Sequence, residues 1–390
     1  MLLLLLLLPP VVVGVAAFFL GKRRITPLEV VVQIGVVGAL IVGGYYATRW
    51  LGVQDTEIWN GRIASAGSGT SSCCHSYDCN CHEVCTGEGD QRSCSQHCDT
   101  CYEHSSDVYW EAYSSNGEQV YYDGCNPPGS PTPARYLDIR LGEPTAVEHR
   151  FTNYVKADPD ALIHRDPALR RFRSRLPPYP RVSGWQVRRF LFVDLAPADM
   201  LELDDALDEL NADLGAAKQV DVIVVVVAEE DPAYFDALAA AWLGGKKNDV
   251  VLVIGAPRFP AIAWARVMAW NKATGAEDEL EGALARRVEL LGAFDGAAVL
   301  AVLRDEITRG YQRRPFSELD YLMARARPSG TAVAVLLALG LALSALLQWR
   351  FWRNQRRMTG LAPHLRVTAA VRRLRAWWRG RGAGDAPRDG

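Results

Sequence analysis

Residues Val220–Ala228 read VDVIVVVVA, a nearly unbroken run of β-branched side chains. Such a run is typical of a strand that is buried on both faces, as in a parallel sheet covered by helices. The preceding residues 196–217 carry apolar side chains at helical spacing and predict an amphipathic helix. After the run, Asp231 and Pro232 predict the start of a second helix, over residues 232–243.

The alternation of strands and helices continues toward the C-terminus. Val250–Ile254 predicts a second buried strand, and Ala261–Trp270 predicts a third. Two more helices are expected, over Glu277–Leu291 and Ala297–Gly310. Elements in this order predict an α/β fold with a small, partly parallel sheet covered by helices.

This order of elements resembles the TPM domain family over about residues 196–312. The resemblance rests on the strand Val222–Val227, on AWLGGKKNDVVLVIG (Ala241–Gly255) and on FDGAAVLAVLRDEITRGY (Phe294–Tyr311). It implies a TPM-like fold, with either a role in binding and assembly or a phosphatase activity that uses divalent cations. In the second case, acidic residues near the strand ends would bind the cation, and the candidates here are Asp221, Asn248 and Asp249.

A cysteine-rich module begins with SSCCHSYDCNCHEVC (Ser71–Cys85) and extends over residues 71–130. It has few large apolar residues, so we expect covalent or metal cross-links to hold it together. Disulfides are the preferred interpretation, zinc is the alternative, and a redox role for the CxxC at Cys98–Cys101 is the third. The candidates for disulfides, or alternatively for zinc ligands, are all nine cysteines: Cys73, Cys74, Cys79, Cys81, Cys85, Cys94, Cys98, Cys101 and Cys125.

Histidines lie among these cysteines, and they favour zinc because disulfides have no need of them. The candidate zinc ligands form two sets, with His97 in addition: Cys79, Cys81, His82 and Cys85, and Cys94, Cys98, Cys101 and His104. The module also contains Asn116-Gly117 between two strand-like runs, which predicts a β-hairpin.

Three apolar segments, residues 2–20, 28–46 and 331–349, predict transmembrane helices. A cleaved signal peptide is the alternative for the first, although its positive charge (Lys22–Arg24) follows the apolar run. Residues 350–390 hold eleven arginines, and positive charge favours the cytoplasmic side. We therefore expect an integral membrane protein with its N-terminus and ectodomain outside the cytoplasm and its tail inside.

The expected organisation follows from these segments. In chain order we expect a transmembrane hairpin (1–50), a linker (51–70), the cysteine-rich module (71–130), a β-containing connecting region (131–195), the α/β domain (196–325), the third transmembrane helix (331–349) and a basic tail (350–390). In the connecting region, Arg135–Arg140 and Gln186–Asp194 are predicted as strands.

The tail predicts a basic amphipathic helix over residues 362–380, suited to an anionic lipid surface. Nucleic acid or an acidic partner is the alternative there, whereas the ectodomain is acidic and is not expected to bind nucleic acid. The candidate membrane-surface residues are Arg366, Arg372, Arg373, Arg375, Trp377, Trp378 and Arg379.

Three functions are consistent with the sequence. The first is a non-enzymatic binding or assembly protein at the outer face of a membrane, with a membrane-protein partner. The second is a metal-dependent, phosphatase-like hydrolase, and the third is a structural membrane protein of a virus or cell surface. The sequence has no GxxxxGK[ST], GxSxG or GxGxxG motif.

Overall fold

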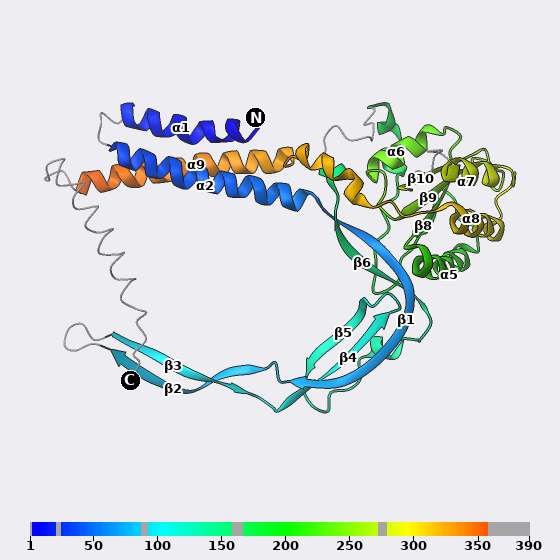
Figure 1. Cartoon of the computed structure of the whole chain (residues 1–390), viewed down its shortest axis with the longest axis horizontal. Helices are drawn as coiled ribbons and strands as arrows, with labels where there is room; N and C mark the ends of the chain where they lie inside the picture. The colour runs from blue at the N-terminus through cyan, green and yellow to red at the C-terminus, as the bar shows by residue number, and fades with distance from the viewer. Residues whose placement is uncertain (1, 21–24, 87–92, 158–166, 272–278, 358–390) are drawn as a thin grey trace. The chain divides into compact units, whose positions relative to one another are not determined.

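The structure is a computed structural model, and it describes residues 2–20, 25–86, 93–157, 167–271 and 279–357 (Figure 1). The chain divides into two compact units. One comprises Met1–Gly52 with Arg327–Gly390, and the other comprises Val53–Ala326.

The first unit contains three long apolar helices, α1 (Leu2–Leu20), α2 (Pro27–Gly52) and α9 (Gly330–Arg357). Each is long and apolar enough to cross a membrane. The prediction of transmembrane helices is thereby confirmed at the level of length and composition.

A buried amide links the three helices. Gln33 of α2 donates hydrogen bonds to the carbonyl oxygen of Pro10 in α1 and to Ser344 Oγ in α9, both at 3.0 Å. Its own side-chain oxygen accepts a hydrogen bond from Gln348 Nε2 at 2.9 Å. Buried polar side chains that pair with one another hold apolar helices together in a bilayer.

The second unit contains a four-stranded sheet in the order β10-β9-β8-β7. Strands β7 (Phe190–Val193), β8 (Asp221–Val227) and β9 (Asp249–Gly255) run parallel, and β10 (Trp264–Ala269) is antiparallel to β9. The predicted small, partly parallel sheet is confirmed.

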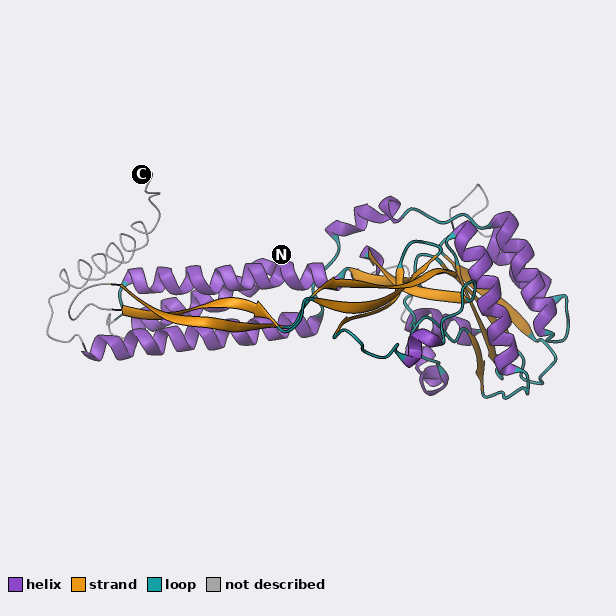
Figure 2. Cartoon of the chain, turned by 90° about the horizontal axis from the view of Figure 1, so that it is seen from below, coloured by secondary structure: helices purple, strands orange, loops and turns teal. Residues whose placement is uncertain are grey.

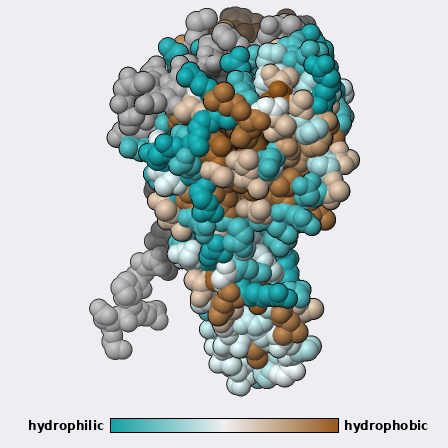
Figure 3. Space-filling view, turned by 90° about the vertical axis from the view of Figure 1, so that its right-hand side faces the viewer, coloured by the Kyte–Doolittle hydropathy of each residue, from teal (hydrophilic) through white to brown (hydrophobic). Residues whose placement is uncertain are grey.

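Helices cover both faces of this sheet, and the side chains of β8 alternate between them. Val222, Val224 and Val226 pack in one core with helices α5 (Met200–Lys218), α7 (Glu279–Glu289) and α8 (Gly296–Gly310). Ile223, Val225 and Val227 pack in a second core with α6 (Ala233–Ala241) and the 3-10 helix η2 (Pro167–Arg175). Burial on both faces explains why the strand has no polar alternation. Some hydrophobic residues also reach the surface of this part of the protein (Figure 3).

A second, antiparallel sheet has the order β5-β4-β1-β6. Its strands are β1 (Gln54–Ser72), β4 (Ser106–Ser114), β5 (Gln119–Asn126) and β6 (Pro144–Thr152). The predicted hairpin at Asn116-Gly117 joins β4 to β5, with Gly117 at φ +82°.

Two sequence predictions in this region were wrong. Residues 51–70, expected as a linker, form the end of α2 and most of β1. The strand was not predicted because the buried positions of β1 include the polar residues Asp55, Glu57 and Asn60. Arg135–Arg140, expected as a strand, begins in the short helix α3 (Ala134–Leu137). The connecting region contributes β6 and β7 as strands, together with α4 (Tyr154–Ala157).

The remaining strands, β2 (Ser76–Thr86) and β3 (Ser93–Tyr102), pair only with each other in an antiparallel ribbon (Figure 2). The 3-10 helix η3 (Phe316–Ala324) lies near the C-terminal end of the second unit.

Candidate functional site

Disulfides cross-link the β2–β3 ribbon along its length. Cys85 bonds to Cys94, Cys81 to Cys98 and Cys79 to Cys101, and a fourth bond joins Cys74 to Cys125 of β5. The disulfide interpretation is confirmed for these eight cysteines. The two predicted zinc sets are wrong because their six thiols are consumed by the three disulfides of the ribbon. The CxxC redox interpretation is wrong for the same reason, since Cys98 and Cys101 bond to different partners.

The ribbon exposes side chains on both of its faces. Tyr77 is 51% exposed and Tyr102 is 58% exposed. His82 and His97 lie opposite each other in the register, with ring centroids 5.7 Å apart. An isolated two-stranded ribbon is marginally stable in water, so the disulfides replace the core that it lacks.

At the base of the ribbon, four metal-ligating side chains come together. These are Cys73, His75, His104 and Asp107, and one ligand atom of each lies within 4.8 Å of the others. Of the predicted zinc ligands, Cys73 and His104 belong to this group. His75 and Asp107 were not predicted as ligands, although CxH and HxxD spacing is visible in CCH (73–75) and HSSD (104–107).

The predicted cation ligand Asp221 is engaged by protein groups. Its Oδ1 lies 2.8 Å from Arg189 Nε and accepts a hydrogen bond from Asn60 Nδ2, also at 2.8 Å. Burial raises the pKa of Asp221, although the positive charge of Arg189 acts in the opposite direction. The positive charge beside the Asp221 carboxylate is therefore supplied by the guanidinium of Arg189.

Asp249 and Asn248 are likewise buried in contacts within the second unit. Asp249 Oδ2 accepts hydrogen bonds from the Tyr179 hydroxyl at 2.8 Å and from the backbone N–H of Lys246 at 2.6 Å. Burial, with the nearby charge of Asp221, raises the pKa of Asp249 to about 8. Asn248 Nδ2 donates to the carbonyl oxygen of Ile58 at 2.6 Å. Asp249 Oδ2 and the Asn248 amide are thus already engaged by protein groups, and these contacts do not by themselves form the predicted divalent-cation site.

Buried acidic residues of β1 lie with Asp221, Asn248 and Asp249 in one polar cluster between the two sheets, which we call the polar joint. Asp55 forms an ion pair with Lys246 at 2.5 Å. Glu57 Oε1 lies 2.6 Å from Arg313 Nη2 and 3.1 Å from Lys247 Nζ. These pairs explain how β1 buries charged side chains without unpaired charge.

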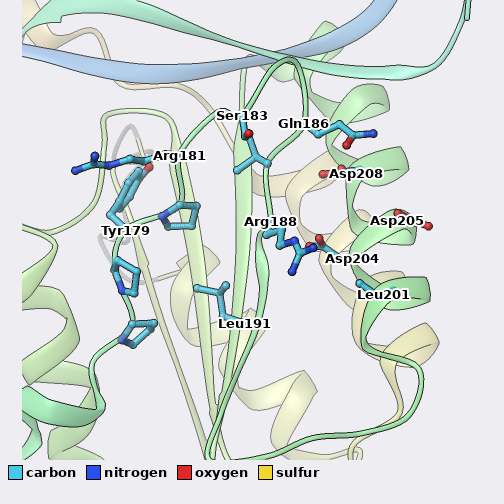
Figure 4. Close-up of a pocket in the computed structure, with 14 residues that line it drawn as sticks. Tyr179, Arg181, Ser183, Gln186, Arg188, Leu191, Leu201, Asp204, Asp205 and Asp208 are labelled. Carbon is cyan, nitrogen blue, oxygen red and sulfur yellow. The ribbon is translucent and has the colours of Figure 1, made fainter. Parts of the chain in front are cut away.

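A cleft of about 870 Å³ opens beside this joint (Figure 4). Figure 4 shows Asp204, Asp205 and Asp208 of α5 on one side and Tyr179 and Arg181 on the other. Burial raises the pKa of Asp208 to about 7, even though Arg189 Nη1 lies 2.5 Å from its Oδ1. The cleft is large enough for a small ligand.

Residues 350–357 of the basic tail form the end of α9, and residues 358–390 lie outside the described residues. The undescribed part includes Arg366, Arg372, Arg373, Arg375, Trp377, Trp378 and Arg379, whose role at a lipid surface stays a prediction.

Comparisons with known proteins give one partial similarity. The chain is 32% identical over 108 residues to GTPase Der of Thermosynechococcus vestitus, which covers 26% of this chain and 22% of that protein. The chain thus spans less than a quarter of the length of this curated relative. No family model matches the sequence, and no solved structure matches it. The TPM resemblance therefore stays a prediction.

Proposed function

We propose that the protein is a membrane-anchored, non-catalytic binding or assembly protein whose second unit lies outside the cytoplasm and contacts a membrane-protein partner. The observation that carries this proposal is the β2–β3 ribbon. Three disulfides hold it in shape, while its side chains remain exposed on both faces.

An exposed, covalently fixed ribbon suits recognition. A rigid surface loses less conformational entropy on binding than a flexible one. Tyr77 and Tyr102 add exposed aromatic surface, the kind that is enriched at interfaces. The acidic residues that a phosphatase would need are instead held in the buried joint at Asp221 and Asp249.

The disulfides also support the proposed location. Disulfides persist in oxidising compartments and are rare in the cytosol. In the sequence, Lys22–Arg24 and the arginine-rich tail favour the cytoplasmic side, which leaves residues 51–330 on the other side. We extend the proposal to the tail, which would lie on anionic lipid beside the membrane helices.

Site-specific photocrosslinking tests the contact. A photoreactive amino acid is placed at Tyr77 or Tyr102 in the full chain in its native membrane, and at Tyr122 of β5 as the control. Tyr122 is 56% exposed, so it matches the other two in accessibility. We expect one membrane-protein adduct from the two ribbon positions, with at least tenfold less from Tyr122. Equal adducts from all three positions, or none from the ribbon, would contradict the proposal.

The location is tested separately in sealed vesicles of known orientation. The full chain is treated with a membrane-impermeant reductant and then with a membrane-impermeant maleimide. We expect the eight disulfide-bonded cysteines to be labelled only where the extracytoplasmic face is accessible. Labelling only from the cytoplasmic face would reverse the topology.

A further inference from the structure

Four side chains meet where the β1–β4 ladder passes into the β2–β3 ribbon. Ser72 pairs with Ser106 on one side of this junction, and Ser76 pairs with Tyr102 on the other. Cys73 and His75 lie on the first crossing segment, and His104 and Asp107 lie on or beside the second. The two segments are joined by a hydrogen bond from the Glu103 N–H to the His75 carbonyl oxygen, at 3.1 Å.

The four groups already surround a small volume. Asp107 Oδ1 contacts His104 Nε2, and Asp107 Oδ2 lies 3.5 Å from His75 Nδ1. Asp107 Oδ2 also accepts a hydrogen bond from the Cys74 N–H at 2.6 Å, which fixes the carboxylate. The rings of His75 and His104 have centroids 5.1 Å apart. The Asp107 side chain is fully buried and Cys73 is only 6% exposed, whereas the side chains of His104 and His75 are 18% and 37% exposed, so the group is buried on one side and reachable from solvent on the other.

Cys73 is the one cysteine outside the four disulfides. A polar network around Asp107 accounts for both histidines, and the Cys73 thiol lies 3.5 Å from the His75 carbonyl oxygen, but neither contact requires a cysteine at this position. The cysteines elsewhere in the ribbon are paired, so this thiol has no disulfide partner within the chain. A metal ligand is a role that a buried, unpaired thiol can fill in an oxidised module.

We propose that Cys73, His75, His104 and Asp107 bind one Zn²⁺ ion. Thiolate, imidazole and carboxylate are the ligands zinc takes in tetrahedral sites, with bonds of about 2.0–2.3 Å that place ligand atoms about 3.3–3.8 Å apart. The ligand atoms here lie within 4.8 Å of one another, so small side-chain movements form the site: His104 Nε2 and Asp107 Oδ1 separate to admit the ion, and the other ligand atoms approach it.

The charges of such a site balance. Binding converts the Cys73 thiol to a thiolate, and its proton leaves to solvent. Thiolate and carboxylate together carry two negative charges, which neutralise the zinc ion, while both imidazoles remain neutral. With four protein ligands the site is closed, and closed zinc sites are structural. The ion would tie the two crossing segments together at the point where the chain passes from the core sheet to the ribbon.

Metal analysis of the full chain in detergent tests the site. The protein is stripped with a chelator, reloaded with zinc or cobalt, and compared with Cys73→Ser and His75→Gln. The matched control is His82→Ala/His97→Ala, which removes the other facing histidine pair of the same ribbon. Zinc per chain, the thiolate-to-cobalt absorption band, and the count of intact disulfides are measured together.

We expect one zinc per chain in the wild type and in the His82/His97 control. Cys73→Ser and His75→Gln should weaken zinc binding at least about tenfold while four disulfides remain, and Cys73→Ser should abolish the cobalt–thiolate band. In the wild type, zinc should protect one thiol from alkylation, which needs no variant and therefore stands even if a variant misfolds. Zinc content that is equal in wild type and Cys73→Ser, uptake of copper without zinc, or alkylation that zinc does not slow would each overturn the assignment.

Discussion

The β7–β10 sheet and the β2–β3 ribbon are stabilised in opposite ways. Every side chain of β8 and β9 is buried, and apolar packing on two faces holds the sheet together. The ribbon buries almost nothing and depends on three cross-strand disulfides. The sheet is therefore destabilised by a cavity or an unpaired buried charge, whereas the ribbon is destabilised by reduction of its disulfides.

Reduction should produce the largest difference between the two regions. Each disulfide in general contributes about 2–4 kcal/mol to the free energy of unfolding. An isolated two-stranded ribbon is only marginally stable, so losing this contribution should unfold it. After treatment of the full chain with a phosphine, we expect the amides of β2 and β3 to lose their protection against hydrogen exchange, while those of β8 and β9 keep theirs. Mass spectrometry of the peptides checks this. A ribbon that stays protected after reduction would show that other contacts hold it.

Removing one buried cation should give the next largest effect, now confined to the α/β sheet. Arg189 is 2% exposed and pairs with both Asp208 and Asp221. Arg189→Ala leaves the two carboxyl groups without their cation, and we expect a loss of about 3–5 kcal/mol in the free energy of unfolding of this sheet.

Urea-dependent hydrogen exchange of β8 peptides measures the loss. The neighbouring Arg188 is exposed, so Arg188→Ala is the matched control and should change stability by less than about 0.5 kcal/mol. The disulfides should remain intact in both variants. Similar losses in both would mean that the buried ion pairs do not stabilise the sheet.

The third effect is a pH dependence, which changes stability least between neighbouring pH values. Burial raises the pKa of Asp208 from 3.8 to about 7, so between these values the folded protein holds a proton that the unfolded chain lacks. Stability therefore falls as pH rises through this window, by up to about 1.4 kcal/mol per pH unit from this group. Asp208→Asn should flatten the dependence between about pH 5 and pH 7, and thermal unfolding at several pH values measures it.

Asp205, an exposed neighbour on the same helix, supplies the control. Asp205→Asn should leave the wild-type slope unchanged. If Asp208→Asn also keeps that slope, the pH dependence comes from another group, such as Asp249.

The same contrast explains which strands could be predicted from the sequence and which could not. The strands β8 and β9 are unbroken apolar runs, and their positions were predicted to within a residue or two. The first half of β1 was missed because its inward side chains include Asp55, Glu57 and Asn60, whose partners come from distant segments such as Lys246 and Arg313. Local periodicity cannot reveal that a buried charge is paired with a residue far along the chain.

The candidate sites show the same limit. Residue types predicted that the cysteines would be cross-linked, but spacing could not give the pairing, because many pairings of nine cysteines are compatible with it. His75 and Asp107 were missed because the register between β1 and β4 brings them together, and that register is not visible in either segment alone. The acids Asp221 and Asp249 were found, but their engagement by Arg189 and Tyr179 was not.

The connectivity of the disulfides also governs the order in which they can form. The pairs Cys85–Cys94, Cys81–Cys98 and Cys79–Cys101 are nested, each inside the next, with sequence separations of 9, 17 and 22. Once the innermost pair has closed, each further closure spans only a short additional loop, so we expect oxidation to proceed from the tip of the ribbon toward its base. The outermost bond, Cys74–Cys125, has a separation of 51 and must wait until Cys125 has been synthesised. Until then Cys73 and Cys74 are both unpaired thiols, so correct oxidation requires that Cys74, and not its neighbour Cys73, bonds to Cys125.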